Sequence, residues 1–78
     1  MRRRERRLIV AFYTTHDAMA FEDHCNARGA EGRLIPLPRE ISAGCGLAWS
    51  APAGSEAALR ARLAEAGIEP QHLREIEI

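Results

Sequence analysis

The 78-residue sequence has few aromatic residues, only two cysteines, no net charge and no long apolar run. Aromatic residues make up 5% of the chain and do not alternate with basic residues, which argues against an RNA-recognition sheet. Eleven basic and eleven acidic residues cancel, so no overall field attracts nucleic acid or a membrane surface. No segment approaches the roughly 20 apolar residues of a membrane span. We therefore expect a small protein whose partners are neither nucleic acid nor membrane.

The N-terminus is basic, because five of the first seven residues are arginines. The apolar run that follows, Leu8–Tyr13, falls short of the roughly 7–15 residues of a signal-peptide core, and no small-residue cleavage site follows it. We expect a cytoplasmic protein in which residues 1–7 form a basic flexible tail and residues 8–78 form one domain. The tail is either a solvated end or a contact for RNA or an acidic partner.

The pattern of apolar and turn residues predicts four strands and two helices. A capping box of Thr14 and Asp17 begins the first helix, and Gly29 ends it. Ser55 caps the second helix, and Gly67 ends it. Short apolar or alternating runs predict the strands Leu8–Tyr13, Arg33–Leu37, Cys45–Ser50 and Leu73–Ile78.

This β-α-β-β-α-β order is typical of the ferredoxin-like α+β fold. In that fold the four strands form one antiparallel sheet ordered 4-1-3-2, with both helices on one face. The start of the first helix, at Thr14, Thr15 and His16, then lies at the same sheet edge as the loop between the second and third strands. The first strand is apolar on both sides, so we expect something to cover the sheet face away from the helices.

That loop contains Cys45, which stands between Gly44 and Gly46. Glycines allow backbone angles that other residues resist, and they leave no side chain to shield the sulfur. We expect an accessible thiol at the junction of a loop and a strand. The alternative is a glycine-rich hairpin in which Cys45 acts as a small apolar residue at the start of the strand.

Several neighbours are candidate supporting groups for a reactive thiolate. Arg39 lies in the same loop and His16 lies in the first turn of the predicted helix, and either cation stabilises a nearby thiolate. The backbone N–H groups around the two glycines offer an anion cradle. Each residue also has a structural interpretation: Arg39 pairs with Glu40, His16 is a surface residue, and Ser42 closes the turn.

The second cysteine, Cys25, falls on the apolar face of the first helix with Phe21, which indicates a buried packing residue. It is expected to lie toward the opposite edge of the sheet from Cys45, which disfavours a disulfide. The cysteines and histidines match no zinc spacing, and His72 is an unconvincing extra ligand. We predict no metal site.

Two stretches, Phe12–Ala18 and Pro38–Ala48, resemble the two signatures of the selenium/sulfur carrier-like family of small bacterial proteins. The second stretch carries the pattern Pro-Arg-x-x-Ser-x-x-Cys-Gly. The resemblance extends over nearly the whole chain from Leu8. It implies that Cys45 carries sulfur or selenium, and that His16 and Arg39, which match motif positions, support it.

A carrier of this kind needs one nucleophilic sulfur and no cofactor beyond the atom that it carries. The resemblance implies a non-enzymatic carrier with at most sulfurtransferase-like thiol exchange. Its partners would be a cysteine desulfurase-like donor and an acceptor enzyme. Two alternatives stay open: a regulatory or interaction module that dimerises or binds a metabolite through its open sheet face, and a thiol redox sensor.

Overall fold

A computed structural model describes residues 4–78 of the chain. Its six elements follow the predicted β-α-β-β-α-β order. They are β1 (Arg6–Ala11), α1 (Thr15–Arg28), β2 (Arg33–Pro36), β3 (Leu47–Pro52), α2 (Glu56–Ala66) and β4 (His72–Glu77). No helix in the described part of the chain is long and apolar enough to cross a membrane.

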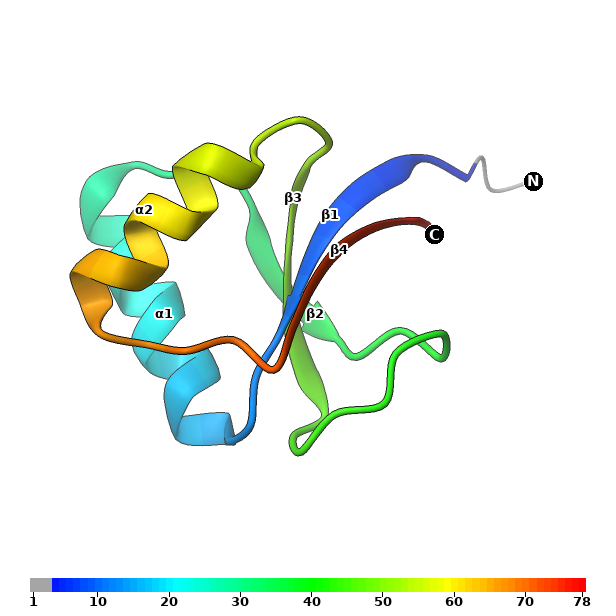
Figure 1. Ribbon diagram of the computed structural model, residues 1–78, viewed down its shortest axis with the longest axis horizontal. Coiled ribbons are helices and arrows are strands. Elements are labelled where there is room, and N and C mark those ends of the chain that lie inside the picture. Colours follow the sequence, from blue (N-terminus) through cyan, green and yellow to red (C-terminus); the bar gives the residue numbers. More distant parts are fainter. Residues whose placement is uncertain (1–3) are drawn as a thin grey trace.

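The four strands form one antiparallel sheet in the order β2-β3-β1-β4. Val10 at the centre of β1 pairs with Trp49 of β3 on one side and with Leu73 of β4 on the other. Figure 1 shows the sheet nearly edge-on, with both helices on one side of it. The predicted ferredoxin-like fold is therefore confirmed, including its strand order.

The helix ends form where the sequence predicts them. Thr14 caps α1, and its hydroxyl accepts a hydrogen bond of 3.1 Å from the backbone N–H of Asp17. Gly29 and Gly67 end the two helices in the left-handed conformation, with φ of 68° and 70°, a region that glycine enters without steric cost. The Thr14 cap thus defines the N-terminal end of α1, which follows β1.

The sheet has an apolar cluster on each face. On the helix side, Phe21 packs against Phe12 and edge-on against Trp49, with both ring centroids 5.6 Å away. On the other face, Ile9 and Ala11 of β1 are fully buried. Their cover comes from residues 37–46, hereafter the cysteine loop, which joins β2 to β3 and contributes Ile41 to this second cluster. The expected cover is therefore, at this end of the sheet, part of the same chain.

Apart from the start of β2, every strand boundary differs from the predicted one by one or two residues. Strand β1 begins at Arg6, so two arginines assigned to the flexible tail belong to the sheet, and Glu5 exchanges backbone hydrogen bonds of 3.0 and 3.1 Å with Ile78. Two-sided pairing with β3 and β4 extends the strand beyond its apolar run. The predictions for residues 1–3 lie outside the described residues. Strand β1 ends earlier than predicted, at Ala11, and β3 begins later, at Leu47, which leaves Cys45 in the loop.

Candidate functional site

The cysteine loop contacts both faces of the sheet. Ile41 and the partly buried Ala43 pack against the cluster on the face away from the helices, whereas Cys45 belongs to the helix-side cluster. In Figure 1 the loop, in green, projects from the side of the sheet opposite the helices and returns to β3 at the lower edge. The first turn of α1 lies at this same edge, as the topology predicts.

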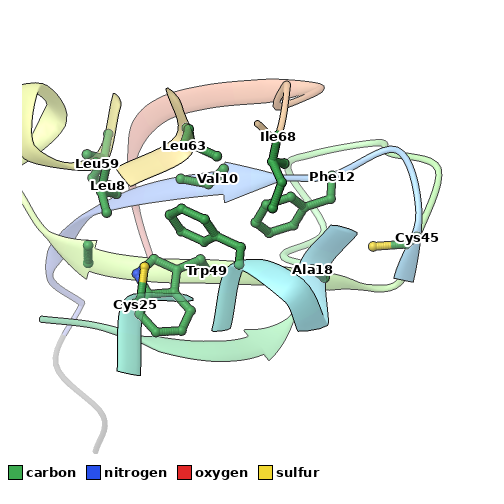
Figure 2. Close-up of a cluster of buried hydrophobic side chains, with 12 residues drawn as sticks. Leu8, Val10, Phe12, Ala18, Cys25, Cys45, Trp49, Leu59, Leu63 and Ile68 are labelled. Carbon is green, nitrogen blue, oxygen red and sulfur yellow. The ribbon is translucent and has the colours of Figure 1, made fainter. Parts of the chain in front are cut away.

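Cys45 is more enclosed than the sequence suggests, because only 8% of its surface is exposed. Its Sγ donates a hydrogen bond of 3.3 Å to the carbonyl oxygen of Leu47, a contact that requires a protonated sulfur. Figure 2 shows the sulfur pointing toward Ala18 in the first turns of α1. The expectation of an accessible thiol is therefore wrong for this conformation, although its place beside a loop–strand junction is right.

Close approach of Gly44 to the end of β1 causes this enclosure. A Cβ atom at Gly44 would clash with the carbonyl oxygen of Tyr13, so only glycine fits there. Neither Gly44 nor Gly46 has a positive φ, and a Cβ at Gly46 would meet nothing within 4 Å. The prediction that these glycines adopt unusual backbone angles is thus wrong at both positions. At Gly44 the reason for a glycine is instead its close contact with the backbone of Tyr13.

The start of β4 holds the cysteine loop through three side chains. Gln71 accepts a hydrogen bond of 2.7 Å from the N–H of Gly44 on its Oε1. His72 Nε2 lies 2.9 Å from the carbonyl oxygen of Ser42, and Arg74 donates to the carbonyl oxygen of Glu40 over 2.7 Å. Since a carbonyl oxygen only accepts, the Nε2 of His72 carries a proton in this contact. The N–H of Gly44 is already bonded and does not cradle an anion in this conformation.

Sequence reasoning missed Gln71, which precedes β4, and His72 and Arg74 of β4 as part of the site. Their signal lay in the predicted strand order, because β4 is the neighbour of β1, and His72 pairs with Ala11 at the end of β1. Long polar side chains at positions 72 and 74, which share one face of β4, therefore reach the loop beside that edge. The single-residue properties of Gln71 and His72 gave no such indication.

His16 and Arg39 are exposed, and among residues 4–78 neither side chain makes a hydrogen bond or an ion pair. The alternative pairing of Arg39 with Glu40 does not occur, since Glu40 pairs with Arg4 at 3.6 Å. Ser42 is exposed and contributes its carbonyl oxygen to the contact with His72. The structure thus brings Ser42 and Gly44 into the loop anchorage, and leaves the side chains of His16 and Arg39 without a hydrogen-bonding or ionic partner among residues 4–78.

Cys25 is fully buried within α1, as predicted. Burial raises the pKa of its thiol from 9.0 to about 11, although the positive charge of Arg62 partly offsets the effect. Both cysteines are free. Within the part of the chain that the structure describes, no group of three histidine, cysteine or acidic side chains is placed to hold a metal ion.

The sequence model of one protein family, described as "Putative Se/S carrier protein-like", matches residues 7–75. The chain belongs to this family. The match includes both stretches on which the resemblance rests, as well as the β4 residues that anchor the cysteine loop. No curated protein and no solved structure matches the chain significantly. The description of this family names the carrying of selenium or sulfur as the function to consider for the chain.

Proposed function

We propose that this chain is a cytoplasmic carrier of sulfur or selenium, and that Cys45 bears the carried atom as a persulfide or its selenium analogue. The observation that supports the proposal most directly is the position of Cys45. It lies outside regular secondary structure, in a loop whose contacts with β4 are made by three side chains. Membership of the Se/S carrier-like family supports the same function.

The loading step is a thiol exchange. The Cys45 sulfur, as a thiolate, attacks the terminal sulfur of a donor persulfide, a new S–S bond forms, and the S–S bond of the donor breaks. The donor leaves as a thiolate and takes up the proton that Cys45 lost, so the exchange needs no separate oxidant. A second attack by an acceptor thiol on the terminal sulfur returns Cys45 to its starting state. Nothing beyond this exchange is required of the carrier itself.

The sulfur has to leave its enclosed position before it can attack. In the enclosed conformation it donates to the Leu47 carbonyl and points toward Ala18. Gln71, His72 and Arg74 hold the loop by side-chain hydrogen bonds, each of which contributes only about 1–3 kcal/mol, and Ile41 holds it by burial on the far face of the sheet. A movement of residues 42–46 that leaves Ile41 in place breaks only two of these side-chain hydrogen bonds, those to Gln71 and His72. It is therefore much less costly than unfolding of the sheet, and a docked partner can favour it.

His16 and Arg39 are proposed as the groups that meet the incoming partner. Both are exposed, and Arg39 belongs to the loop that opens. A donor persulfide is anionic near neutral pH, so a cation beside its path favours its approach. Replacing either residue by alanine is expected to slow loading of Cys45 without affecting the fold. The donor would be a cysteine desulfurase-like enzyme, and the acceptor an enzyme that uses the delivered atom.

Incubation with a cysteine desulfurase and free cysteine, followed by intact-mass analysis, tests the proposal. The parent and the control variant Cys25→Ala should gain one or more sulfur atoms, which dithiothreitol removes, and Cys45→Ser should gain none. The proposal is overturned if the parent fails to load from several desulfurases and from low-molecular-weight persulfides and their selenium analogues. A disulfide-linked dimer without added sulfur would instead identify a thiol redox sensor.

A further inference from the structure

The cysteine loop covers only part of the sheet face away from the helices, and the remainder forms a hollow of about 630 Å³. The hollow lies at the end of the sheet where Glu5 and Ile78 pair. The C-terminus marks this end of the sheet in Figure 1. Its volume falls in the range of roughly 300–1,000 Å³ that small-molecule sites occupy. Its walls combine two arginines with two isoleucines, Ile35 and Ile78.

The first arginine, Arg7 of β1, is held in place by Ser50. Its Nε donates to the Ser50 hydroxyl over 3.0 Å and its Nη2 to the Ser50 carbonyl over 3.4 Å. Ser50 is itself almost fully buried. The Nη1 atom lies 3.9 Å from a carboxylate oxygen of Glu5, beyond hydrogen-bond distance, and makes no hydrogen bond within residues 4–78. A guanidinium with a fixed orientation and unused donors is well suited to a carboxylate or phosphate.

The second arginine, Arg33 of β2, pairs directly across the sheet with Ser50. Its side chain is exposed and forms no ion pair within the described residues 4–78. Arg7 and Arg33 therefore stand on the strands at either side of Ser50 and face the same hollow. Glu5 is the one acidic residue of this lining, and most of its side chain is in solvent.

An adjoining depression of about 410 Å³ extends the hollow toward the cysteine loop. It shares Arg33, Ile35 and Ile78 with the hollow and is bounded by Pro38 and Glu40 of the loop.

We propose that the hollow binds a small organic anion, whose carboxylate or phosphate contacts Arg7 and Arg33 and whose short apolar chain lies on Ile35 and Ile78. The unused donors of Arg7 and the exposed guanidinium of Arg33, which forms no ion pair within residues 4–78, favour an anionic head group. The apolar part of the ligand extends toward Pro38, at the beginning of the loop that carries Cys45. This binding site is separate from the thiol exchange at Cys45 and does not depend on it.

Amide chemical shifts of the labelled full chain, titrated with three probes of similar length, test the site. Hexanoate and hexyl phosphate carry the two candidate head groups, and hexylammonium carries the opposite charge. The two anions should shift the amides of residues 32–35, 50 and 78, and the stronger of them identifies the head group. Hexylammonium should leave these amides unchanged. Equal shifts with hexylammonium, or shifts confined to other residues, would overturn the proposal.

Two variants with opposite expected effects separate charge recognition from structural damage. Arg33→Gln should weaken binding of the stronger anion roughly threefold to fivefold, as for an exposed charge contact. Glu5→Gln should strengthen the same binding, because it removes the carboxylate that lies 3.9 Å from Nη1 of Arg7. Arg60→Gln, on the exposed face of α2, is the matched control and should bind like the parent. Unchanged affinity in Arg33→Gln, or weaker binding in Glu5→Gln, would contradict an anion site.

Discussion

Cys25 and Cys45 are both buried members of the same helix-side cluster, yet the structure around them differs in the way that matters for reactivity. Cys25 lies in the last turns of a 14-residue helix, beside the aromatic core. Cys45 lies in a loop, two residues before β3, and its only hydrogen bond goes to the nearby Leu47 carbonyl among the described residues. Exposure alone therefore does not distinguish the two thiols. They differ in what must move to expose the sulfur: a helix for Cys25, and a loop for Cys45.

The largest expected difference is the rate of alkylation under native conditions. Cys25 becomes reachable only when α1 leaves the core, and with a pKa of about 11 only roughly one of its thiols in a thousand is ionised at pH 8. Cys45 requires only a local opening of the loop. Iodoacetamide labelling followed by peptide mass spectrometry should find Cys45 modified at least about a hundredfold faster. Comparable rates would remove the basis for choosing Cys45.

The two glycines that flank Cys45 give the next contrast. In Gly44→Ala the new methyl group would lie against the Tyr13 carbonyl, so we expect a loss of about 1–3 kcal/mol of stability, or a lifted loop and faster labelling of Cys45. Gly46→Ala adds a methyl group in open space at an ordinary backbone angle, and should stay within about 0.5 kcal/mol of the parent. Urea unfolding and the labelling rate measure both. Equal behaviour of the two variants would contradict the packing described for Gly44.

A smaller effect is expected from the β4 anchors. Gln71→Ala removes the acceptor for the Gly44 N–H, a loss of about 1 kcal/mol in the closed loop that should speed labelling of Cys45 roughly fivefold. The rate at Cys25 should not change, because α1 makes no use of this contact. Arg60→Ala, on the exposed side of α2, serves as the control variant. A parallel increase at both cysteines would mean that the whole domain, and not the loop, had loosened.

The smallest expected effect concerns the region around Cys25 and depends on pH. Hydrogen bonds from Arg62 and His24 lower the pKa of Glu65 from 4.5 to about 2, and the contact with His24 joins α2 to α1. Because the charged form is favoured in the folded state, its stabilising effect is complete above about pH 4.5 and disappears as the pH falls toward 2. The melting temperature of Glu65→Gln should therefore lie roughly a degree or two below that of the parent at pH 7, and the difference should vanish near pH 2. A difference that persists at pH 2 would mean that packing, not charge, causes it.

The fold could be predicted from local signals that agree with one another. The Thr14 cap, the helix-ending glycines and the alternation of Ile76 and Ile78 all follow from short-range chemistry, and the structure confirms each. The burial of Cys45 could not be predicted in this way. It results from the contact of Gly44 with Tyr13 and from anchors on β4, which are more than 20 residues away in sequence. The hollow beside Arg7 was missed because an arginine-rich start was interpreted as a tail, whereas strand pairing brings Arg6 and Arg7 into the sheet.

The measurement that tests the central claim most directly lets the two cysteines compete within one molecule. The parent protein is loaded with a cysteine desulfurase and cysteine, its remaining thiols and persulfides are alkylated after unfolding, and the added sulfur is located by peptide mass spectrometry. The account predicts added sulfur on the peptide that contains Cys45 and a single unmodified sulfur on the peptide that contains Cys25. Added sulfur on Cys25, or equal amounts on both peptides, would contradict it.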